Sequence, residues 1–103
     1  MKNLTKLTAW RSRAYLDWVK QQPSCASGLP ADDAHHIKGY GFGGTVKAPD
    51  WAAMPLTREE HTTFHNMGWQ TWEEEHGSQW QHVAKTLGKA LDDGIIRIKE
   101  GKK

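Results

Sequence analysis

The stretch of sequence that decides the fold runs from Ala34-His35-His36-Ile37 to His61-Thr62-Thr63-Phe64-His65-Asn66, with a glycine-rich loop between the two ends. It holds four of the six histidines of this 103-residue chain. Three imidazole nitrogens that bind an ion, with a fourth histidine left as a base, are the content of a metal-dependent hydrolytic site. The two histidine clusters therefore predict such a site.

The second histidine cluster lies on a predicted helix. Thr57-Arg58-Glu59-Glu60 has the pattern of a capping box, which begins a helix, and Gly68 offers the left-handed position that ends one. Residues four apart on a helix share a face, with roughly 5–6 Å between Cβ atoms, so His61 and His65 can hold one ion together. Alone, such a pair more often marks a solvated face. The second cluster upstream favours metal binding.

The first cluster lies in Asp32-Asp33-Ala34-His35-His36-Ile37, which we interpret as a strand leading into the glycine loop. Neighbouring strand residues point to opposite faces, so both histidines serve one site only where the strand ends or bends. One would bind the ion, and the other would stand beside it as a base, since an imidazole with a pKa of about 6.5 can take a proton from water. The alternative is that one of the two is a structural histidine.

The loop Gly39-Tyr40-Gly41-Phe42-Gly43-Gly44 satisfies the letters of a dinucleotide-binding fingerprint. That fingerprint needs a helix opening inside it, and Thr45-Val46-Lys47-Ala48-Pro49 cannot start one there. We therefore reject nucleotide binding and expect glycines that allow tight turns and a close approach to DNA. Lys38 and Lys47, at the two ends of the loop, are the first candidates for phosphate contacts.

Helices are expected on both sides of this stretch. An amphipathic arm over about 4–22 carries an apolar stripe of Leu4, Leu7, Trp10, Ala14, Tyr15, Trp18 and Val19. A short helix follows over Trp69 to Glu75. A second capping box, Ser78-Gln79-Trp80-Gln81, opens a helix that Gly94 closes, with a stripe of Trp80, Val83, Ala84, Leu87 and Leu91. Residues 95–98 are expected to add a strand or dock on the core, and the six tryptophans to be chiefly core.

The length of the chain, 103 residues, indicates one small domain with a modest core. A net charge of +2 does not by itself demand a nucleic-acid partner. The single cysteine, Cys25, excludes a disulfide framework and suits a reducing compartment. The chain has no apolar leader and no run of membrane-spanning length, so a cytoplasmic protein with no membrane partner is expected.

The order of a histidine doublet on a strand, a glycine-rich loop, a second strand over Trp51 to Leu56 and a helix with His-x-x-x-His resembles the ββα-metal finger of HNH (His-Me) endonucleases. The resemblance covers nearly the whole chain and is strongest to small phage and prophage HNH nucleases allied to the phage recombination-enhancement nuclease. The residues that carry it are Tyr15-Leu16, Trp18-Val19, Ala34-His35-His36-Ile37-Lys38-Gly39, Lys47-Ala48-Pro49-Asp50, Met54-Pro55-Leu56, His61, His65, Trp72-Glu73-Glu74 and Gly77-Ser78-Gln79.

The resemblance implies an α+β fold, with a single nuclease domain over 1–103. A ββα-metal core over about 32–68 would be flanked by the helical arm over 4–22 and by C-terminal helices over 69–94. It makes His36 the general base. The remaining histidines of the motif become the metal ligands: His35, His61 and His65.

Asp50 falls about where the family has an asparagine that pins the loop and orients the base. An aspartate can accept such hydrogen bonds but cannot donate as an amide does. Arg58 joins Lys38 and Lys47 as an expected DNA contact. The cofactor is one divalent metal ion, drawn from Zn, Ni, Mn, Co or Mg.

The chain departs from its relatives at the segment Ser24-Cys25-Ala26-Ser27-Gly28. Relatives often carry a Cys-x-x-Cys knuckle there and a cysteine at the head of the metal helix, where this chain has Thr57. One cysteine cannot build a four-ligand structural zinc site. We therefore expect one metal ion, with this turn held by packing or by Ser and Asp side chains.

The expected function is metal-dependent hydrolysis of DNA phosphodiester bonds in the bacterial host cell. Three classes compete with it: a non-catalytic zinc module that binds DNA or protein, a metallohydrolase acting on other esters or amides, and a plain helical interaction protein. Expected partners are DNA, a second copy of the chain if both strands are cut together, and phage or host recombination or replication proteins.

Overall fold

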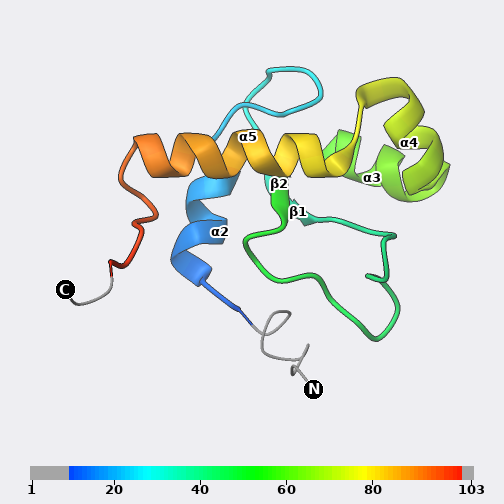
Figure 1. The fold of residues 1–103 in the computed structure, drawn as a ribbon. Coiled ribbons are helices and arrows are strands. Elements are labelled where there is room, and N and C mark those ends of the chain that lie inside the picture. Colours follow the sequence, from blue (N-terminus) through cyan, green and yellow to red (C-terminus); the bar gives the residue numbers. More distant parts are fainter. Residues whose placement is uncertain (1–9, 101–103) are drawn as a thin grey trace.

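The structure, a computed structural model, describes residues 10–100. Its elements follow the order shown in Figure 1: α2 (Arg13–Lys20), β1 (Asp33–His36), β2 (Ala53–Leu56), α3 (Arg58–Met67), α4 (Trp69–His76) and α5 (Gln79–Asp92). Within residues 10–100, no helix combines the length and the apolar character needed to cross a membrane. The predicted α+β class is confirmed.

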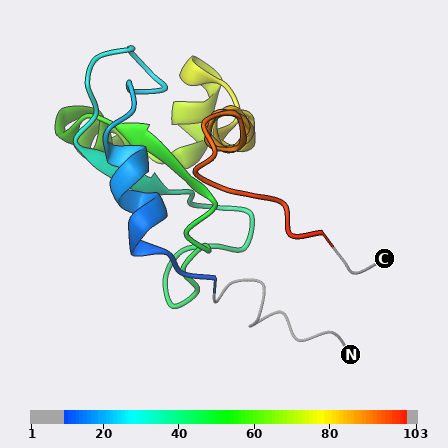
Figure 2. The ribbon, with the colours of Figure 1, turned by 90° about the vertical axis from the view of Figure 1, so that its left-hand side faces the viewer.

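The sheet is a single antiparallel pair, in which His35 lies opposite Met54 and His36 opposite Ala53. All four residues of β2 are buried, because helices cover the pair. α2 and α3 contact both strands, and α5 contacts β2. In Figure 1 the long α5 runs across the sheet with α3 and α4 at one end, and Figure 2 shows α5 end-on beside the sheet.

The core consists of three neighbouring clusters. One lies under the glycine loop and α5, with Ile37, Ala48, Ala52 and Val83 buried. A second joins β2 to α3 and α4 through Met54, Leu56, Phe64 and Trp72. The third joins α2 to α5 through Tyr15, Val19 and Ala90. The second cluster fixes α3 against the sheet and so positions the histidines that α3 carries.

The first described helix is shorter than predicted. Within the described part of the arm expected over 4–22, the helix begins at Arg13 and ends at Lys20, while Leu4 and Leu7 lie outside the described residues. Ser12 is extended and caps the helix, accepting from the Tyr15 N–H at 3.1 Å. Its own N–H donates to Asp50 Oδ2 at 2.7 Å, and the Asp50 N–H donates to Trp10 O at 3.0 Å. These long-range contacts outweigh the local helical pattern.

The turn over 24–28 is held by side-chain hydrogen bonds. The Ser24 hydroxyl donates to Glu60 Oε1 at 2.5 Å and accepts from the backbone N–H groups of Ala26 and Ser27. Glu60 also completes the predicted capping box, since Oε1 accepts from the Thr57 N–H at 2.9 Å. The turn was expected to be held by packing or by Ser and Asp side chains: Ser24 holds it, the acidic partner is Glu60 instead of an aspartate, and Cys25 and Ala26 also pack on the second cluster.

The C-terminal helix turns a different face to the core than its apolar stripe predicted. α5 buries Gln79, Val83, Thr86 and Ala90, whereas Ala84 is exposed and Leu91 is 45% exposed. Ser78 caps it through the Trp80 N–H, without the reciprocal contact expected from Gln81. The small residues on the buried face allow α5 to lie close to β2 and α2.

Residues 95–98 form no strand. The N–H groups of Ile95 and Ile96 both donate to Ala90 O, which closes the helix, and Ile96 packs on the third cluster. Ile98 is 78% exposed. Of the two alternatives for residues 95–98, docking on the core is the one observed, and it rests on Ile96.

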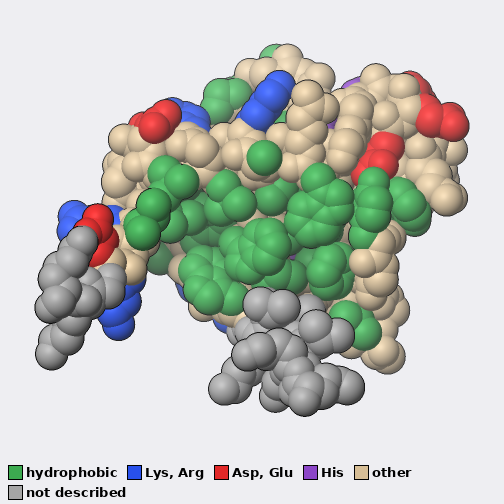
Figure 3. Space-filling model, viewed as in Figure 1, with side chains coloured by type: hydrophobic (Ala, Val, Ile, Leu, Met, Phe, Trp, Pro, Cys, Tyr) green, Lys and Arg blue, Asp and Glu red, His purple; other side chains and the backbone are tan. Residues whose placement is uncertain are grey.

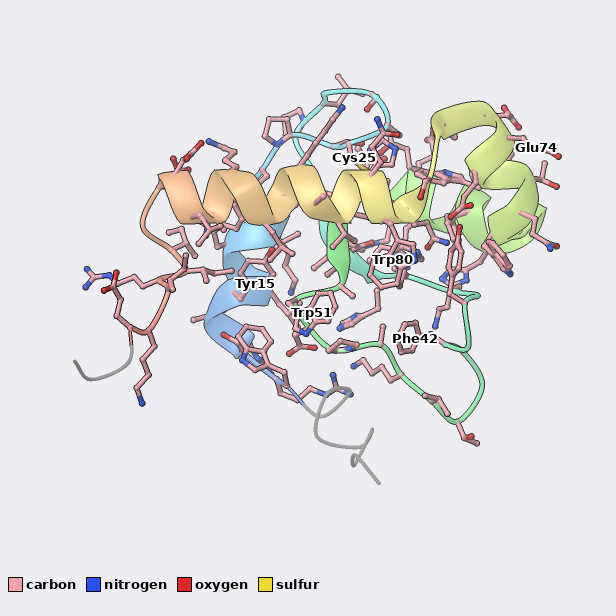
Figure 4. All side chains as sticks on the ribbon, in the orientation of Figure 1. Tyr15, Cys25, Phe42, Trp51, Glu74 and Trp80 are labelled. Carbon is pink, nitrogen blue, oxygen red and sulfur yellow. The ribbon has the colours of Figure 1, made fainter. Side chains whose placement is uncertain are left out.

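The tryptophans are less buried than expected. Trp72 is fully buried, but Trp10 is 41% exposed and Trp51 and Trp80 are half-buried. Hydrophobic side chains gather on the face seen in Figure 3, below α5, and Figure 4 places Trp51, Trp80 and Phe42 on it. The expectation that these rings are chiefly core is therefore wrong for Trp10. The rings of Trp51 and Trp80 lie 6.1 Å apart and form part of the edge of the core.

Candidate metal centre

Three histidines from β1 and α3 meet at one point. His61 and His65 lie one turn apart on α3, and His35 faces them from β1, with ring centroids 4.8 Å from His61 and 5.6 Å from His65. One ring nitrogen from each lies within 4.8 Å of the others. Two nitrogens bound tetrahedrally to one zinc ion at about 2.1 Å are about 3.4 Å apart, so the three rings are near the spacing of a ligating arrangement and would have to close on the ion. The three predicted ligands are thus brought together.

His35 is the buried member of this cluster. It is 1% exposed, its ring packs 4.2 Å from that of Phe64, and neither ring nitrogen has a hydrogen-bond partner among the described residues. Burial, followed by the neighbouring His61 and His65, lowers the pKa of His35 to about 3, so the ring is neutral at physiological pH. A neutral, unpaired imidazole in the interior is costly unless its lone pair binds something. A divalent ion fits this requirement.

His61 and His65 complete the donor set at the rim. His61 is partly exposed and His65 is exposed, so an ion held here would keep one side open to solvent. Burial, with smaller effects from His61 and Lys38, lowers the pKa of His65 and favours its neutral, ligating form. Three imidazoles with an open side match the ligand count of a catalytic rather than a structural site.

The second histidine of the doublet lies beside this cluster and contacts an aspartate. β1 ends at His36, which satisfies the condition set by strand alternation for both histidines to reach one site. His36 Nε2 lies 2.8 Å from Asp50 Oδ1. Because an ionised carboxylate only accepts, Nε2 carries the proton and Nδ1 keeps the lone pair. Burial lowers the pKa of His36, while the bond to Asp50 opposes that shift.

Asp50 is itself held firmly. It is 3% exposed, and its Oδ2 accepts from the Ser12 N–H. Burial raises its pKa, but the bonds from His36 and Ser12 outweigh that effect and leave the pKa lowered. Arg11 Nη1 lies 3.7 Å from Asp50 Oδ1 and donates to Ala48 O at 2.9 Å. Asp50, the residue expected to orient His36, is therefore in contact with it. The same carboxylate binds Ser12, the residue that caps the start of α2.

The histidines open into a cavity of about 310 Å³ beneath the glycine loop. Two of its lining residues are basic, Lys38 and Lys47, and no carboxylate among the described residues lines it. Such a lining attracts an anion. The full lining is Ala34, His35, His36, Lys38, Gly43, Gly44, Val46, Lys47, His61 and His65.

Arg58, the third predicted DNA contact, does not line that cavity. Its Nε–H and Nη2–H groups donate to the Asp33 carboxylate at 3.1 and 3.0 Å, although its side chain is 75% exposed. Asp33 Oδ2 also lies 3.0 Å from His61 Nδ1. Strand alternation places Asp33 and His35 on one face of β1, and this spacing is the signal in the sequence that could have identified Asp33.

A second contact that the sequence did not reveal ties α5 to the site. Gln79 is fully buried, and its side-chain amide accepts from the Lys38 N–H at 3.0 Å and donates to Lys38 O at 2.8 Å. Glu73 Oε2 accepts from both the backbone and the side-chain amide of Gln79. The backbone that follows the histidine doublet is therefore fixed by a helix about forty residues away.

Cys25 and His82 are also metal-binding residue types, but neither is available as a ligand of this cluster. Burial raises the pKa of the Cys25 thiol to about 12, so it stays protonated and is a poor ligand. His82 Nε2 lies 2.7 Å from the backbone carbonyl oxygen of His76, a structural contact within the C-terminal half.

Comparison with known proteins places the chain in a family. Residues 2–94 match the family described as "Protein of unknown function (DUF968)". The chain is 37% identical over 94 residues to a protein of Escherichia coli strain K12 named "Uncharacterized protein YdfU". That similarity covers 90% of this chain and 27% of the relative, so the chain spans about a quarter of the relative's length. No solved structure matches. Since the family match takes in nearly the whole sequence, this chain belongs to the DUF968 family.

Proposed function

We propose that this protein is a metal-dependent endonuclease of the ββα-metal (HNH) type that hydrolyses DNA phosphodiester bonds. The proposal depends on one observation: a cluster of three histidines and a His–Asp pair lie side by side at one cavity. The buried His35, with unpaired ring nitrogens, faces His61 and His65. His36, paired with Asp50, lies beside them. The chain order of β1, glycine loop, β2 and α3 supports the ββα-metal assignment.

The metal ligands in this proposal are His35, His61 and His65. A divalent ion bound there would supply Lewis acidity to a phosphate oxygen and stabilise the negative charge that develops on the phosphoryl group and the leaving oxygen. Imidazole ligands suit zinc, nickel, cobalt or manganese better than magnesium. One ion is expected for each chain.

His36 acts as the base that activates water. Asp50 holds the proton on Nε2, so Nδ1 presents its lone pair, and the lowered pKa keeps the ring unprotonated at physiological pH. The water oxygen attacks phosphorus as its proton passes to Nδ1, and the bond from phosphorus to the 3′ oxygen breaks. The 3′ oxygen leaves with the bonding electron pair and takes up a proton from solvent, which gives a 3′ hydroxyl and a 5′ phosphate. Asp50 then stabilises the imidazolium that forms.

The basic cavity selects a phosphate substrate. Lys38 and Lys47 lie at the two ends of the glycine loop and line the same cavity, where they can contact the phosphates that flank the scissile bond. Gln79 fixes the backbone of Lys38 and so limits where that lysine can reach. This charge favours a phosphodiester over an amide or a neutral ester.

The test is cleavage of supercoiled plasmid and of single-stranded DNA by wild-type protein, His36→Ala and a matched control, His76→Ala, across magnesium, manganese, nickel, cobalt and zinc. Bound metal is counted in parallel. Wild type and His76→Ala should cut, whereas His36→Ala should lose at least about 100-fold in rate while keeping its metal. Metal binding without any cutting by the wild type would refute the nuclease and leave a zinc-dependent binding module as the function.

A further inference from the structure

The carboxylate of Asp33 contacts a proposed metal ligand from behind. Its Oδ2 lies 3.0 Å from His61 Nδ1, the ring nitrogen on the far side from Nε2. The same carboxylate accepts two hydrogen bonds from Arg58, at 3.0 Å to Oδ1 and at 3.1 Å to Oδ2. Three residues from β1 and α3 therefore form a connected chain, Arg58 to Asp33 to His61.

This contact decides which nitrogen of His61 can bind an ion. A neutral imidazole has one N–H donor and one acceptor nitrogen. The Arg58 guanidinium donates two hydrogen bonds to the Asp33 carboxylate, which favours its ionised form. The carboxylate is therefore ionised and can only accept. The proton of His61 must then lie on Nδ1, which leaves the Nε2 lone pair for the ion.

His61 needs such a partner more than His35 does. His35 is held by the core against Phe64, but the side chain of His61 is 28% exposed and has room to rotate. Asp33 restricts that rotation, and Arg58 in turn restricts Asp33, because the two planar groups are joined by a bidentate pair. Partners of this kind typically change metal affinity by 10–100-fold.

We propose that Asp33 is a positioning residue of the metal centre: it fixes the tautomer and orientation of His61, and Arg58 holds it in place. This inference rests on the metal site of the proposed function, but it does not depend on DNA cleavage. It assigns Arg58 a role in building the site that is distinct from contact with DNA.

Asp33→Asn is the sharpest perturbation, because it keeps the shape and replaces one oxygen by an NH₂ donor. That donor can point at His61 Nδ1 and so favour the tautomer with its proton on Nε2, the ligating atom. Asp32→Asn is the matched control. Asp32 carries the same charge one residue earlier, and its carboxylate accepts from the Arg58 N–H.

The measurement is titration of chelator-stripped protein with cobalt(II), followed by its d–d absorption, with circular dichroism to confirm that each variant is folded. Asp33→Asn should bind cobalt 10–100-fold more weakly than wild type, Arg58→Gln by a smaller factor, and Asp32→Asn within about twofold. Equal affinity of Asp33→Asn and wild type would overturn the proposal. So would an equal loss in Asp32→Asn, since that result would reduce the effect to charge.

A second readout is independent of the ion. Long-range proton–nitrogen spectra of histidine-labelled, metal-free protein should show His61 protonated on Nδ1 in wild type and on Nε2, or on both in exchange, in Asp33→Asn. An unchanged tautomer would refute the role of Asp33 even if metal affinity fell. Failure of the wild type to bind cobalt would refute the metal site and this inference together. Cobalt binding without DNA cleavage would refute only the nuclease, while the affinity ratio still decides the role of Asp33.

Discussion

Acid should destabilise the metal-free protein through His35. In the unfolded chain this ring takes up a proton as the pH falls through about 6.5, but in the folded protein burial lowers its pKa to about 3. The folded state is therefore at full stability above about pH 6.5 and loses stability progressively as the pH falls toward 3. Each pH unit in that window costs about 1.4 kcal/mol, so acidification from pH 6.5 to 5 removes about 2 kcal/mol. That is a large part of the stability of a small domain.

The assay is urea unfolding in the presence of a chelator, followed by tryptophan fluorescence, at several values between about pH 7.5 and pH 5. His36 and His65 also have lowered pKa values and act in the same direction, so a variant must isolate His35. His35→Leu keeps an apolar side chain of similar size and removes the titration. Its loss of stability over the same range should be smaller by about 2 kcal/mol. If the free energy of unfolding fell with pH equally in wild type and His35→Leu, the account of His35 as a buried, neutral ring would be refuted.

Three further outcomes follow from the geometry. Gly39→Ala should lower the free energy of unfolding by about 3 kcal/mol, because φ is +82° and the new Cβ would lie 2.3 Å from the Trp69 ring. Gly41→Ala, at φ +90° with nothing within 4 Å, should cost only about 1 kcal/mol in the same urea unfolding assay. Gln79→Leu should cost about 2–4 kcal/mol and speed hydrogen exchange at the Lys38 amide, since both backbone groups of Lys38 lose their partner. Zinc at about 100 times its dissociation constant should stabilise the stripped protein by about 2.7 kcal/mol in thermal unfolding. An unchanged midpoint would count against the site.

The parts of the site that sequence predicted well are those set by local geometry. The spacing of His61 and His65 needs only a helix, and the capping box from Thr57 to Glu60 marks where that helix begins. Strand alternation explains why both histidines of the doublet reach one cavity only at the end of β1. That His35 meets α3 does not follow from any period in the sequence. It was expected from the resemblance to HNH nucleases, and the packing of Phe64 under β1 accounts for it.

The parts that sequence missed depend on partners far along the chain. The partner of Asp33 lies 28 residues away and that of Gln79 lies 41 residues away, and nothing local in either segment signals the pairing. The predicted start of α2 was wrong for the same reason. The hydrogen bond from the Ser12 N–H to Asp50 holds Ser12 in the extended conformation of an N-cap. Local propensity is a weak prior where a buried charge needs a backbone donor.

The glycine loop has a consequence for which of its residues can be exchanged. Gly39 and Phe42 exchange both backbone hydrogen bonds at 2.9 Å, and Gly43 and Val46 do the same at 2.7 and 2.9 Å. Two successive closed turns therefore fix the path of the loop through its main chain. Three of the four positions at the tips of these turns, Tyr40, Gly41 and Gly44, have positive φ, and the Tyr40 hydroxyl also donates to Glu73 Oε1 at 2.7 Å. Thr45 is therefore the tip position at which the side chain can be exchanged with the least effect on the path of the backbone.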